Sequence, residues 1–389
     1  MPWRGYKLKI LVVSKYFEPF KGGVETVVLE VCRRLVKKGY EVTVIASNHE
    51  KAFKTTVEKI EGIKVVRTPT WFRFGNAPIS PGVFTAVLKE DYDVLHLHSP
   101  NSFSNPLAFL ANLFKKKPII VTYHSDIIPH SIIMKVFKPI YENTFKRIIL
   151  NSAKVIMPTS PQYVEISDTL PKYRKKIMVV PNGISLKEFK PSKKRKNNTI
   201  LFLGRLIYYK GLDVLLEAMK KVVEEVPDAV LLIAGSGELE GELKKKAKEL
   251  GIAKNVKFLG RVSEEEKEKL MKQCTVFVLP SVHKSEAFGV VILEAMAYGA
   301  PVITTDVSGT VFAAGDAGII VKHGDSKQLA EAIVKVLKDK TLRKKMTEKG
   351  LKHVKKFDWD EIVKKVEKLL PASNQKKNKL KVTPRILKS

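Results

Sequence analysis

The sequence predicts an α/β protein built from two doubly wound, Rossmann-like domains. Short apolar segments alternate with segments of helical periodicity along almost the whole chain, which is typical of parallel βαβ units. A polar, basic stretch at Pro191–Asn198 interrupts this alternation, and the pattern restarts directly after it. The 389 residues suffice for two domains that each have a core. We therefore expect two tandem domains facing each other across a cleft.

The first domain is expected over residues 7–185. The strand Lys9–Val13 precedes a helix that opens at Gly22-Gly23, repeats apolar residues every 3.6 positions and ends at Gly39. Further strands are expected at Glu41–Ala46, Ile63–Arg67, Asp93–His96, Pro118–Tyr123, Lys154–Met157 and Lys176–Val180.

The second domain is expected over residues 199–355, with helices at Leu212–Glu225 and near Gly289–Tyr298. Ser263 and Glu266 form a capping-box pattern that opens another helix. The strands are expected at Thr199–Leu203, Ala229–Ala234, Val256–Leu259, Thr275–Leu279 and Pro301–Thr304. A C-terminal helix over 356–371 precedes a basic tail at 372–389, which contains no acid and is expected to be disordered.

Composition and charge narrow the functional classes. Apolar residues make up 44% and charged residues 28%, which is a globular composition, and no segment is long and apolar enough to span a membrane. Two cysteines without disulfide or metal spacing fit a reducing cytoplasm. The net charge of +30 is compatible with an anionic membrane surface, nucleic acid or a merely solvated surface. Because no nucleic-acid motif is present, we expect no nucleic-acid partner and a cytoplasmic protein, peripheral on the inner face of the cell membrane.

The most informative segment is Ser285–Val302, which runs from a strand end through a loop into a helix. Gly289 lets a ligand approach the backbone at the helix start, where free amides and the helix dipole suit a diphosphate. Glu286 in the loop can bind sugar hydroxyls, and Glu294 in the helix can bind a ribose diol. Alternatively, Glu294 is a solvated helix residue, but its apolar neighbours mean that a charge there needs a partner.

The Glu286-x7-Glu294 spacing, with Phe-Gly inside it and Glu-Ala-Met-Ala-x-Gly-x-Pro-Val at its end, resembles the signature of the retaining GT-B glycosyltransferases (glycosyl transferases group 1, glycosyltransferase family 4). The resemblance covers roughly residues 7–370. It implies a GT-B fold, a nucleoside diphosphate sugar as donor and transfer with retained anomeric configuration. Among the donors of the family we expect a UDP- or GDP-sugar.

Gly204 and Arg205 follow a strand, and Lys210 stands just before the next helix. Two cations at a helix start can neutralise a leaving diphosphate, although surface cations are common in a chain this basic. The resemblance implies that Arg205 and Lys210 bind phosphate and that Gly204 belongs to the donor site.

Other donor contacts are assigned by the resemblance. It implies that the loop of Gly22 and Gly23 closes over the phosphates and the acceptor; this pair does not match G-x-G-x-x-G, which argues against a dinucleotide oxidoreductase. It also implies donor contacts at Val262, which follows a strand, and at Phe288 and Val290 on either side of Gly289.

A histidine and an aspartate follow another first-domain strand. Because His124 directly follows the expected strand Pro118–Tyr123, it should lie at the carboxyl edge of the sheet, where Asp126 could orient it. The resemblance implies a histidine near the sugar, so we assign His124 to the catalytic residues together with Glu286. His98, also at a strand end, is expected with Asp126 to line the acceptor pocket; the alternative for each histidine is a structural role.

Two segments depart from a simple assignment. Asp91-Tyr92-Asp93 matches the Asp-x-Asp pattern of metal-dependent glycosyltransferases but stands at the amino end of its strand. We therefore expect no cofactor and no essential metal, because Arg205 and Lys210 can do the neutralising. Val311-Phe312 replaces the Pro-Glu that many members of the family have, which bears on the choice of donor sugar.

The acceptor is expected to be a glycan or a lipid-linked molecule of the cell envelope. The segment Ile132–Leu150 has the composition of a basic amphipathic helix on an anionic bilayer, although a packed surface helix would show the same pattern. It carries Lys135, Lys138, Lys146 and Arg147 beside Phe137, Tyr141 and Phe145.

The predicted function is transfer of a hexose from a nucleoside diphosphate sugar to an acceptor hydroxyl. The alternatives are a nucleotide-sugar epimerase and a non-catalytic, membrane-associated sugar-nucleotide binding protein. A sugar phosphorylase would need a pyridoxal-bearing lysine in its own motif, which we do not find.

Overall fold

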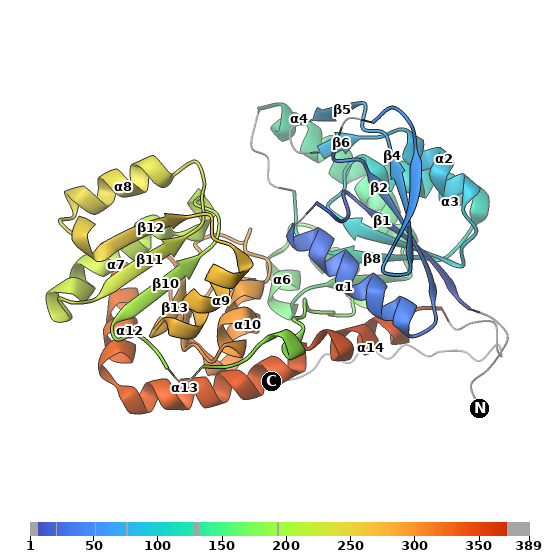
Figure 1. Ribbon diagram of the computed structural model, residues 1–389. Coiled ribbons are helices and arrows are strands. Elements are labelled where there is room, and N and C mark those ends of the chain that lie inside the picture. Colours follow the sequence, from blue (N-terminus) through green and yellow to red (C-terminus); the bar gives the residue numbers. More distant parts are fainter. Residues whose placement is uncertain are drawn as a thin grey trace, which may run out of the picture. The chain divides into compact units, whose positions relative to one another are not determined.

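A computed structural model describes residues 7–20, 22–50, 52–74, 77–127, 132–192 and 194–371. The basic tail expected at 372–389 lies outside these residues. The described chain forms two compact units, each built around a parallel sheet (Figure 1). The α/β class and the two Rossmann-like domains predicted from the sequence are confirmed.

The first unit has a sheet in the order β3-β4-β2-β1-β7-β8-β9 among the described residues. All its pairs are parallel except β3 with β4, which is an antiparallel edge pair. The strand order reverses between β1 and β7, which is a topological switch point where ligands bind in such sheets. The strands are β1 (Lys9–Ser14), β2 (Glu41–Ser47), β3 (Thr56–Ile60), β4 (Ile63–Thr68), β7 (Val94–Ser99), β8 (Ile119–Tyr123) and β9 (Val155–Pro158).

Right-handed crossovers running in opposite directions from β1 and β7 place α1 on one face of this sheet and α3 on the other, as Figure 1 shows. The amphipathic pattern decides which side of α1 is buried: Val27, Val28, Val31 and Leu35 all face the core. The helices are α1 (Gly23–Lys37), α2 (Gly82–Lys89), α3 (Ser104–Lys115), α4 (Ile132–Tyr141), a π-helical turn (Glu142–Lys146) and α5 (Arg147–Ser152). A small hairpin of β5 (Phe72–Phe74) and β6 (Ala77–Ile79) completes the unit with a 3-10 segment at Leu170–Lys176.

The second unit has an entirely parallel sheet in the order β12-β11-β10-β13-β14-β15 among the described residues. Its order reverses between β10 and β13, which gives a second switch point. The strands are β10 (Thr199–Leu203), β11 (Val230–Ala234), β12 (Val256–Gly260), β13 (Val276–Leu279), β14 (Val302–Thr305) and β15 (Ile319–Val321).

The helices of the second unit pack against its sheet, and the buried side chains of both form one hydrophobic core. The capping box predicted at Ser263 and Glu266 is present at the start of α9, with both reciprocal hydrogen bonds. The helices are α6 (Pro161–Ile166), α7 (Leu212–Glu225), α8 (Glu240–Glu249), α9 (Glu264–Gln273), α10 (Val290–Ala297), α11 (Ser308–Ala314), α12 (Ser326–Lys338) and α13 (Lys340–His353).

The two units exchange segments along the chain. The first consists of the described residues up to Pro158, Ser167–Val180 and those from Val363 onward. The second consists of Thr159–Ile166 and Pro181–Ile362, so α6 belongs to it although α6 precedes the polar, basic stretch at Pro191–Asn198 in the sequence. The last helix, α14 (Trp359–Leu369), begins in the second unit and ends in the first.

The strand expected at Lys176–Val180 is wrong. The segment runs beside β9 and its amides at Met178 and Val180 donate to the carbonyls of Ile156 and Pro158, but it forms only an isolated bridge between Ile156 and Ile177. The next bond of a parallel ladder would need an N–H at Pro158, which proline lacks.

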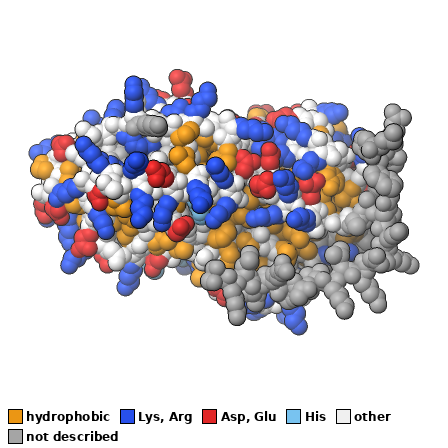
Figure 2. All heavy atoms as spheres, turned by 90° about the horizontal axis from the view of Figure 1, so that it is seen from below, with side chains coloured by type: hydrophobic (Ala, Val, Ile, Leu, Met, Phe, Trp, Pro, Cys, Tyr) orange, Lys and Arg blue, Asp and Glu red, His pale blue; other side chains and the backbone are white. Residues whose placement is uncertain are grey.

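The helical segment predicted at Ile132–Leu150 is present, but one of its cations points inward. Lys146 is buried and pairs with Glu142 and Asp126, at 2.9 and 3.4 Å. On the face seen in Figure 2, Lys and Arg side chains lie at many separate places among acidic and apolar side chains and do not form one patch. Within the described residues, no helix is long and apolar enough to cross a membrane.

Candidate active site

The carboxyl edge of the second sheet is built by loops whose backbones touch. A Cβ atom on Gly211 would lie 2.0 Å from the carbonyl oxygen of Pro280, and one on Gly235 would lie 1.8 Å from that of Gly204. Gly211 and Gly235 also have φ values of +66° and +137°, which side chains disfavour. The loops after β10, β11 and β13 are thereby held against one another, and the residues that follow these strands have fixed positions.

Two of the predicted residues meet directly at this edge. Lys210, at the end of a 3-10 turn, donates a hydrogen bond to Oε2 of Glu286, and the Ser281 hydroxyl donates to the same oxygen at 3.1 Å. Lys210 and Glu286 are both buried. A buried ion pair of this kind needs such additional hydrogen bonds to offset the loss of hydration.

The other predicted cation of this edge is open to solvent. Arg205 is exposed, and its Nη2 donates to the Tyr209 hydroxyl at 3.2 Å. The ammonium of Lys210 lies 5.4 Å from the centroid of the same Tyr209 ring. Tyr209 therefore contacts both cations and holds them on one side of the loop after β10.

Gly289 is the N-cap of α10 and has a φ of +76°, so it makes the sharp entry into that helix. Val290 follows it and packs partly against the core. Phe288 before it is buried in an aromatic cluster, with ring centroids 6.3 Å from Phe312 and 6.0 Å from Phe357. The Phe288 side chain is therefore core, and only its backbone can meet a donor.

The cluster also explains the departure at Val311-Phe312. Where many relatives are expected to have an acid, Phe312 packs edge-on against Phe357 at 5.7 Å as well as against Phe288. The Phe312 ring thus contacts the loop between Glu286 and Gly289 through Phe288.

Glu294 has the partner that its apolar surroundings require. Lys267 of α9 lies 3.3 Å from Oε1 of Glu294 and also pairs with Glu264 at 2.6 Å. Burial raises the pKa of Glu294 above its usual value, and Lys267 only partly offsets this. Burial opposes the charge of Lys267 too, but Glu294 and Glu264 raise the pKa of its ammonium overall. Val262, predicted to contact the donor, lies just before α9 and is partly buried against the core.

In the first unit, Gly22 and Gly23 open α1 as predicted, but an acid occupies the first turn. The Glu25 carboxylate would lie 2.3 Å from a Cβ on Gly22, so that position accepts only glycine while Glu25 keeps this conformation. Burial raises the pKa of Glu25 and lowers that of Lys15, which follows β1. The helix start expected to meet phosphates therefore carries its own carboxylate.

The two predicted histidines of the first unit contact each other. Nδ1 of His98 and Nε2 of His124 are 2.9 Å apart, and the rings stack with centroids at 5.2 Å. The His96 ring lies against His98 at a centroid distance of 4.5 Å and a tilt of 34°, and its Nε2 shares a hydrogen bond of 2.8 Å with the Thr122 hydroxyl. Burial lowers the pKa of His124 to about 4 and that of His96 to about 3.

Asp126 is held by groups other than His124. The Tyr123 hydroxyl donates to its Oδ1 at 2.5 Å, and Lys146 lies 3.4 Å from the same oxygen. Burial alone would raise the pKa of Asp126, but the bond from Tyr123 and the charge of Lys146 lower it overall. The expectation that Asp126 orients His124 is replaced by the pairs His98–His124 and Tyr123–Asp126.

The Asp-x-Asp segment is part of the sheet's amino edge. Asp91 pairs with the Lys9 ammonium at 2.7 Å, and Asp93 accepts the backbone N–H of Lys9 at 2.8 Å. No group of three or more potential metal ligands occurs within the described parts of the chain. Both acids thus fasten the start of β1 to the start of β7.

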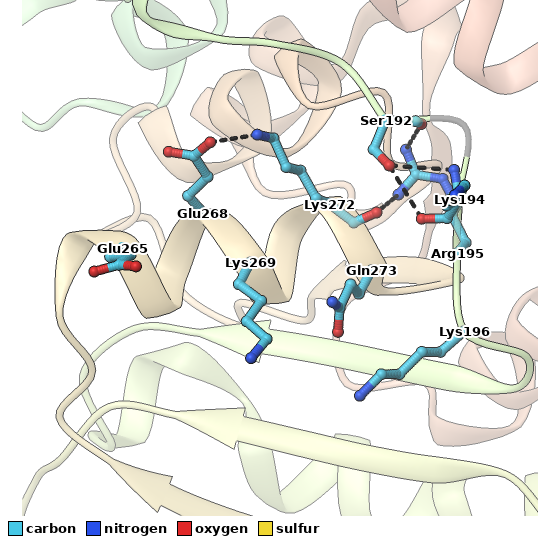
Figure 3. A pocket seen from close by; sticks show the side chains of 9 residues that line it. All are labelled: Ser192, Lys194, Arg195, Lys196, Glu265, Glu268, Lys269, Lys272 and Gln273. Atoms are coloured by element: carbon cyan, nitrogen blue, oxygen red, sulfur yellow. Dashed lines mark hydrogen bonds and ion pairs between the residues drawn. The ribbon is translucent and has the colours of Figure 1, made fainter.

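A basic pocket of about 450 Å³ lies away from these residues, before β10 and at the end of α9 (Figure 3). Arg195 donates there to the carbonyl oxygens of Met271, Lys272 and Cys274 at 3.0–3.4 Å, which are carbonyls at the C-terminal end of α9. Cations are favoured at that end by the helix dipole. These bonds explain the position of Arg195, and none of the predicted site residues lines the pocket. Its lining residues are Ser192, Lys194, Arg195, Lys196, Glu265, Glu268, Lys269, Lys272 and Gln273.

Sequence reasoning did not identify three contributors to these arrangements. Ser281 donates a hydrogen bond to Glu286, Lys267 pairs with Glu294, and the ring of His96 contacts that of His98. The available signal for Ser281 was its position two residues after the end of β13, at the carboxyl edge. Lys267 and His96 are ordinary residue types in their elements, and only the packing reveals them.

Two protein families match the chain. Glycosyltransferase Family 4 matches residues 21–188, and Glycosyl transferases group 1 matches residues 184–353. The O-antigen chain mannosyltransferase C of Escherichia coli is 31% identical over 340 residues, which are 84% of this chain and 88% of that protein. The phosphatidyl-myo-inositol mannosyltransferase of Mycolicibacterium smegmatis is 32% identical over 371 residues, which are 90% of each chain.

Solved structures share the fold. Sucrose-phosphate synthase from Thermosynechococcus elongatus has a TM-score of 0.72 at 21% identity and covers 93% of this chain and 98% of its own. Anabaena HepE in complex with UDP and glucose has a TM-score of 0.71 at 19% identity, with 93% and 99% coverage. These likenesses confirm the GT-B fold. Fold, family and sequence relatives agree, and the chain belongs to the GT-B glycosyltransferases of glycosyltransferase family 4 and glycosyl transferases group 1.

Proposed function

We propose that this glycosyltransferase moves a hexosyl group from a UDP- or GDP-sugar to an acceptor hydroxyl with retention of anomeric configuration. The observation that carries the proposal is the buried pair of Lys210 and Glu286 at the carboxyl edge of the second sheet. Arg205 and Gly289 follow strands at the same edge, where open α/β sheets bind ligands. The mannosyl- and rhamnosyltransferases among the relatives, and the UDP and glucose bound by HepE, support this donor class.

In this proposal the leaving diphosphate is stabilised by Arg205, Lys210 and the free amides at the start of α10. The bond between the anomeric carbon and the diphosphate oxygen breaks, and its electron pair stays on the diphosphate. The acceptor oxygen then bonds to the anomeric carbon from the same face, and its proton passes to the leaving diphosphate. Fixed cations and amides aimed at that developing charge are the largest expected contribution to catalysis.

The two glutamates keep one carboxylate oxygen each for the donor. Lys210 and Ser281 both bond to Oε2 of Glu286, which leaves Oε1 for hydroxyls of the sugar. Lys267 lies against Oε1 of Glu294, which leaves Oε2 for the ribose diol. We propose these roles for Glu286 and Glu294, with further donor contacts at Gly204, Val262 and the backbone of residues 288–290.

His124 is proposed to bind the transferred sugar rather than to act as a base. Because burial lowers its pKa to about 4, its ring is neutral at pH 7 and serves as a hydrogen-bonding group. Gly22 and Gly23 are proposed to close over the phosphates, and His98 and Asp126 to belong to the acceptor side. No essential metal is proposed, since the cations of the donor edge supply the positive charge.

The acceptor is proposed to be a lipid-linked or other envelope glycan at the cytoplasmic face of the membrane. Three apolar side chains are exposed on α4 and α5, Val136 by 61%, Ile140 by 59% and Ile148 by 47%. Lys135 and Arg147 are exposed next to Val136 and Ile148 in the sequence. Apolar side chains flanked by cations are what an anionic bilayer binds.

The adjoining hairpin extends this surface. Trp71 and Phe72 are exposed at its start, and Phe74 ties it to α4 with a ring centroid 5.8 Å from Phe137. Figure 1 shows β5 and β6 beside α4. A membrane-facing acceptor would therefore meet both the hairpin and the helix within the first unit.

The test of the function is a panel of UDP-, GDP- and ADP-sugars in thermal stabilisation, with wild type and Glu294→Ala in parallel. A donor at about 100 times its dissociation constant should stabilise the wild type by roughly 2.7 kcal/mol, and the variant should lose this gain. The stabilising donor is then incubated with envelope glycan acceptors, and the anomeric configuration of the product is compared by NMR with that of the donor. Conversion of the donor without an acceptor would indicate an epimerase, and binding without any product a non-catalytic protein.

A further inference from the structure

The contact between His98 and His124 is built on two strand ends that are themselves fixed. The backbone amide of His124 donates to the carbonyl of Ser99 at 2.8 Å, and the side-chain amide of Asn105 donates to the carbonyl of His98 at 3.0 Å. His98 is 2% exposed and His124 is 7% exposed. The two rings therefore have little freedom to separate.

Two neutral rings can share this hydrogen bond in only two ways. Burial lowers the pKa of both histidines, that of His124 to about 4, so at pH 7 each ring carries one proton. Either Nδ1 of His98 donates to Nε2 of His124, or Nε2 of His124 donates to Nδ1 of His98. The first arrangement puts the His124 proton on Nδ1, and the second puts it on Nε2.

The remaining nitrogen of His98 distinguishes the two arrangements. His98 Nε2 is buried and has no hydrogen-bond partner among the described residues. If His124 donated, His98 would have to carry its proton on this nitrogen and bury an unpaired N–H. Among backbone groups, a buried N–H without a partner is rarer than a buried acceptor with a missing bond, and we apply the same preference to the unpaired imidazole nitrogen of His98. Donation by His98 is therefore favoured.

We propose that His98 is a positioning residue that donates Nδ1–H to His124 and thereby fixes His124 as the Nδ1–H tautomer. The bond uses Nε2 of His124, and Nδ1 is not one of the buried nitrogens that lack a partner. Nδ1 is then the ring nitrogen that meets the ligand, and it meets it as a donor. The sugar atom that His124 contacts is accordingly an oxygen that accepts a hydrogen bond. This inference rests on the proposed placement of His124 beside the donor sugar.

The tautomer is tested directly by NMR of wild-type protein labelled with 15N-histidine, assigned by comparison with His124→Asn. The expected spectrum shows a protonated Nδ1 and a bare Nε2 for His124 at pH 7. The opposite pattern would overturn the proposal. This measurement needs neither donor nor acceptor, so it stands even if the proposed transfer reaction fails.

The positioning role is tested by two variants. His98→Phe keeps an aromatic ring in the stack but has no donor, whereas His98→Asn places an amide N–H close to the position of Nδ1. We expect His98→Phe to lower kcat about tenfold, the size of one neutral hydrogen bond, with an unchanged KM for the donor. His98→Asn should recover most of this loss.

Equal losses in both variants, or full activity in His98→Phe, would refute the positioning role. If neither variant folds, the tautomer in the wild type still decides between the two arrangements. Full transfer by His124→Ala would instead show that the proposed role of His124 is wrong, independently of its tautomer.

Discussion

Lys210 donates a hydrogen bond to the Glu286 carboxylate across 76 positions of sequence, and Ser281 bonds to the same oxygen. The proposed phosphate ligand and the proposed sugar ligand thus hold each other in place in the second unit. A diphosphate that attracts Lys210 competes with Glu286 for its ammonium. Removal of one partner is therefore expected to lower stability as well as catalysis, and the two effects can be separated by mutation.

Replacing Lys210 with Met should reduce both. It leaves the Glu286 carboxylate buried without its cation, which typically costs roughly 3–5 kcal/mol of unfolding free energy. It also removes a cation proposed to stabilise the leaving diphosphate, so kcat should fall roughly 100-fold to 1,000-fold, as for the loss of other fixed groups that stabilise charge. Urea denaturation and steady-state transfer rates measure the two effects.

The matched control is the double variant Lys210→Met/Glu286→Leu, which removes both charges. A well-packed apolar pair is often as stable as the buried ion pair that it replaces. We expect most of the stability to return while the transfer rate stays at least as low as in Lys210→Met. Recovery of activity in the double variant would contradict the assignment of Lys210 and Glu286 to the donor site.

The buried histidines His96, His98 and His124 should make the stability of the first unit sensitive to acid. Since burial lowers their pKa values, the unfolded chain binds more protons than the folded one below pH 6.5. The stability that they contribute is present above pH 6.5 and is lost as pH falls to about 4 for His124 and about 3 for His96.

Each such histidine lowers the unfolding free energy by up to about 1.4 kcal/mol per pH unit within its window. His96→Gln removes one of these groups, and its amide can keep the bond to Thr122. Its unfolding free energy should therefore fall less steeply than that of the wild type between pH 6.5 and 3. Parallel curves for the two proteins would show that His96 is not buried in its neutral form.

The loop of Glu286 depends on a glycine of α11. A Cβ on Gly309 would lie 2.1 Å from the carbonyl oxygen of Ala287 and 2.4 Å from the amide nitrogen of Phe288. Gly309→Ala must therefore displace this loop, at a cost of roughly 1–3 kcal/mol, and donor affinity should fall at least tenfold. Denaturation and donor titration measure these changes.

Gly241 provides the comparison, because it is also helical and a Cβ there would have no atom within 4 Å. Gly241→Ala should raise stability by up to about 1 kcal/mol through helix propensity, without a change in donor binding. If both alanine variants behaved alike, close packing at Gly309 would not be the cause.

How far the sequence predicts the fold depends on burial. The bounds of β10 and α7 coincide with the predicted Thr199–Leu203 and Leu212–Glu225, since one is a buried apolar run and the other has a strong helical period. In contrast, β3 has mostly exposed side chains, and β15 has only three residues. Neither has enough buried positions to reveal a period, so both were missed.

The sequence predicts which edge of a sheet carries each site residue, but not which of these residues contact each other. Because Arg205, Lys210 and Glu286 follow parallel strands, the sequence predicts that they share one edge of a sheet. The pairing of His98 with His124 requires the register of β7 and β8, in which His98 lies opposite Thr122. Alternation of buried and exposed residues would specify this register, but β7 and β8 are buried at every position and show no alternation.

Removal of divalent metal tests whether Asp91 and Asp93 belong to a metal site. Asp91 is paired with Lys9 at the amino end of its strand, away from the edge that carries His124. Asp91→Asn should therefore leave the transfer rate unchanged within about twofold. Addition of EDTA should also leave it unchanged, because Arg205 and Lys210 are proposed to neutralise the diphosphate. Loss of activity in EDTA that magnesium restores would contradict the metal-free proposal.

Membrane binding should depend on the exposed apolar residues of α4, Val136 and Ile140. We expect the wild type to bind vesicles that contain an anionic phospholipid and to bind neutral vesicles much more weakly, since both apolar burial and cation attraction contribute. Val136→Asp adds a charge and removes apolar area at the proposed interface. Co-sedimentation with anionic vesicles should then show affinity reduced roughly tenfold, which is about 1.4 kcal/mol.

Val57 in β3 is the matched control for this measurement. Both valines are 61% exposed and belong to the first unit, but Val57 lies on the edge strand rather than on the helix. If general exposure of valine or net charge governed binding, Val57→Asp and Val136→Asp would weaken it equally. If α4 is the membrane-facing element, only Val136→Asp does so, and high salt should weaken the wild type further because it screens Lys135 and Arg147. If Val136→Asp bound anionic vesicles as tightly as the wild type, α4 would not be the membrane contact. The support for a lipid-linked acceptor would then be lost.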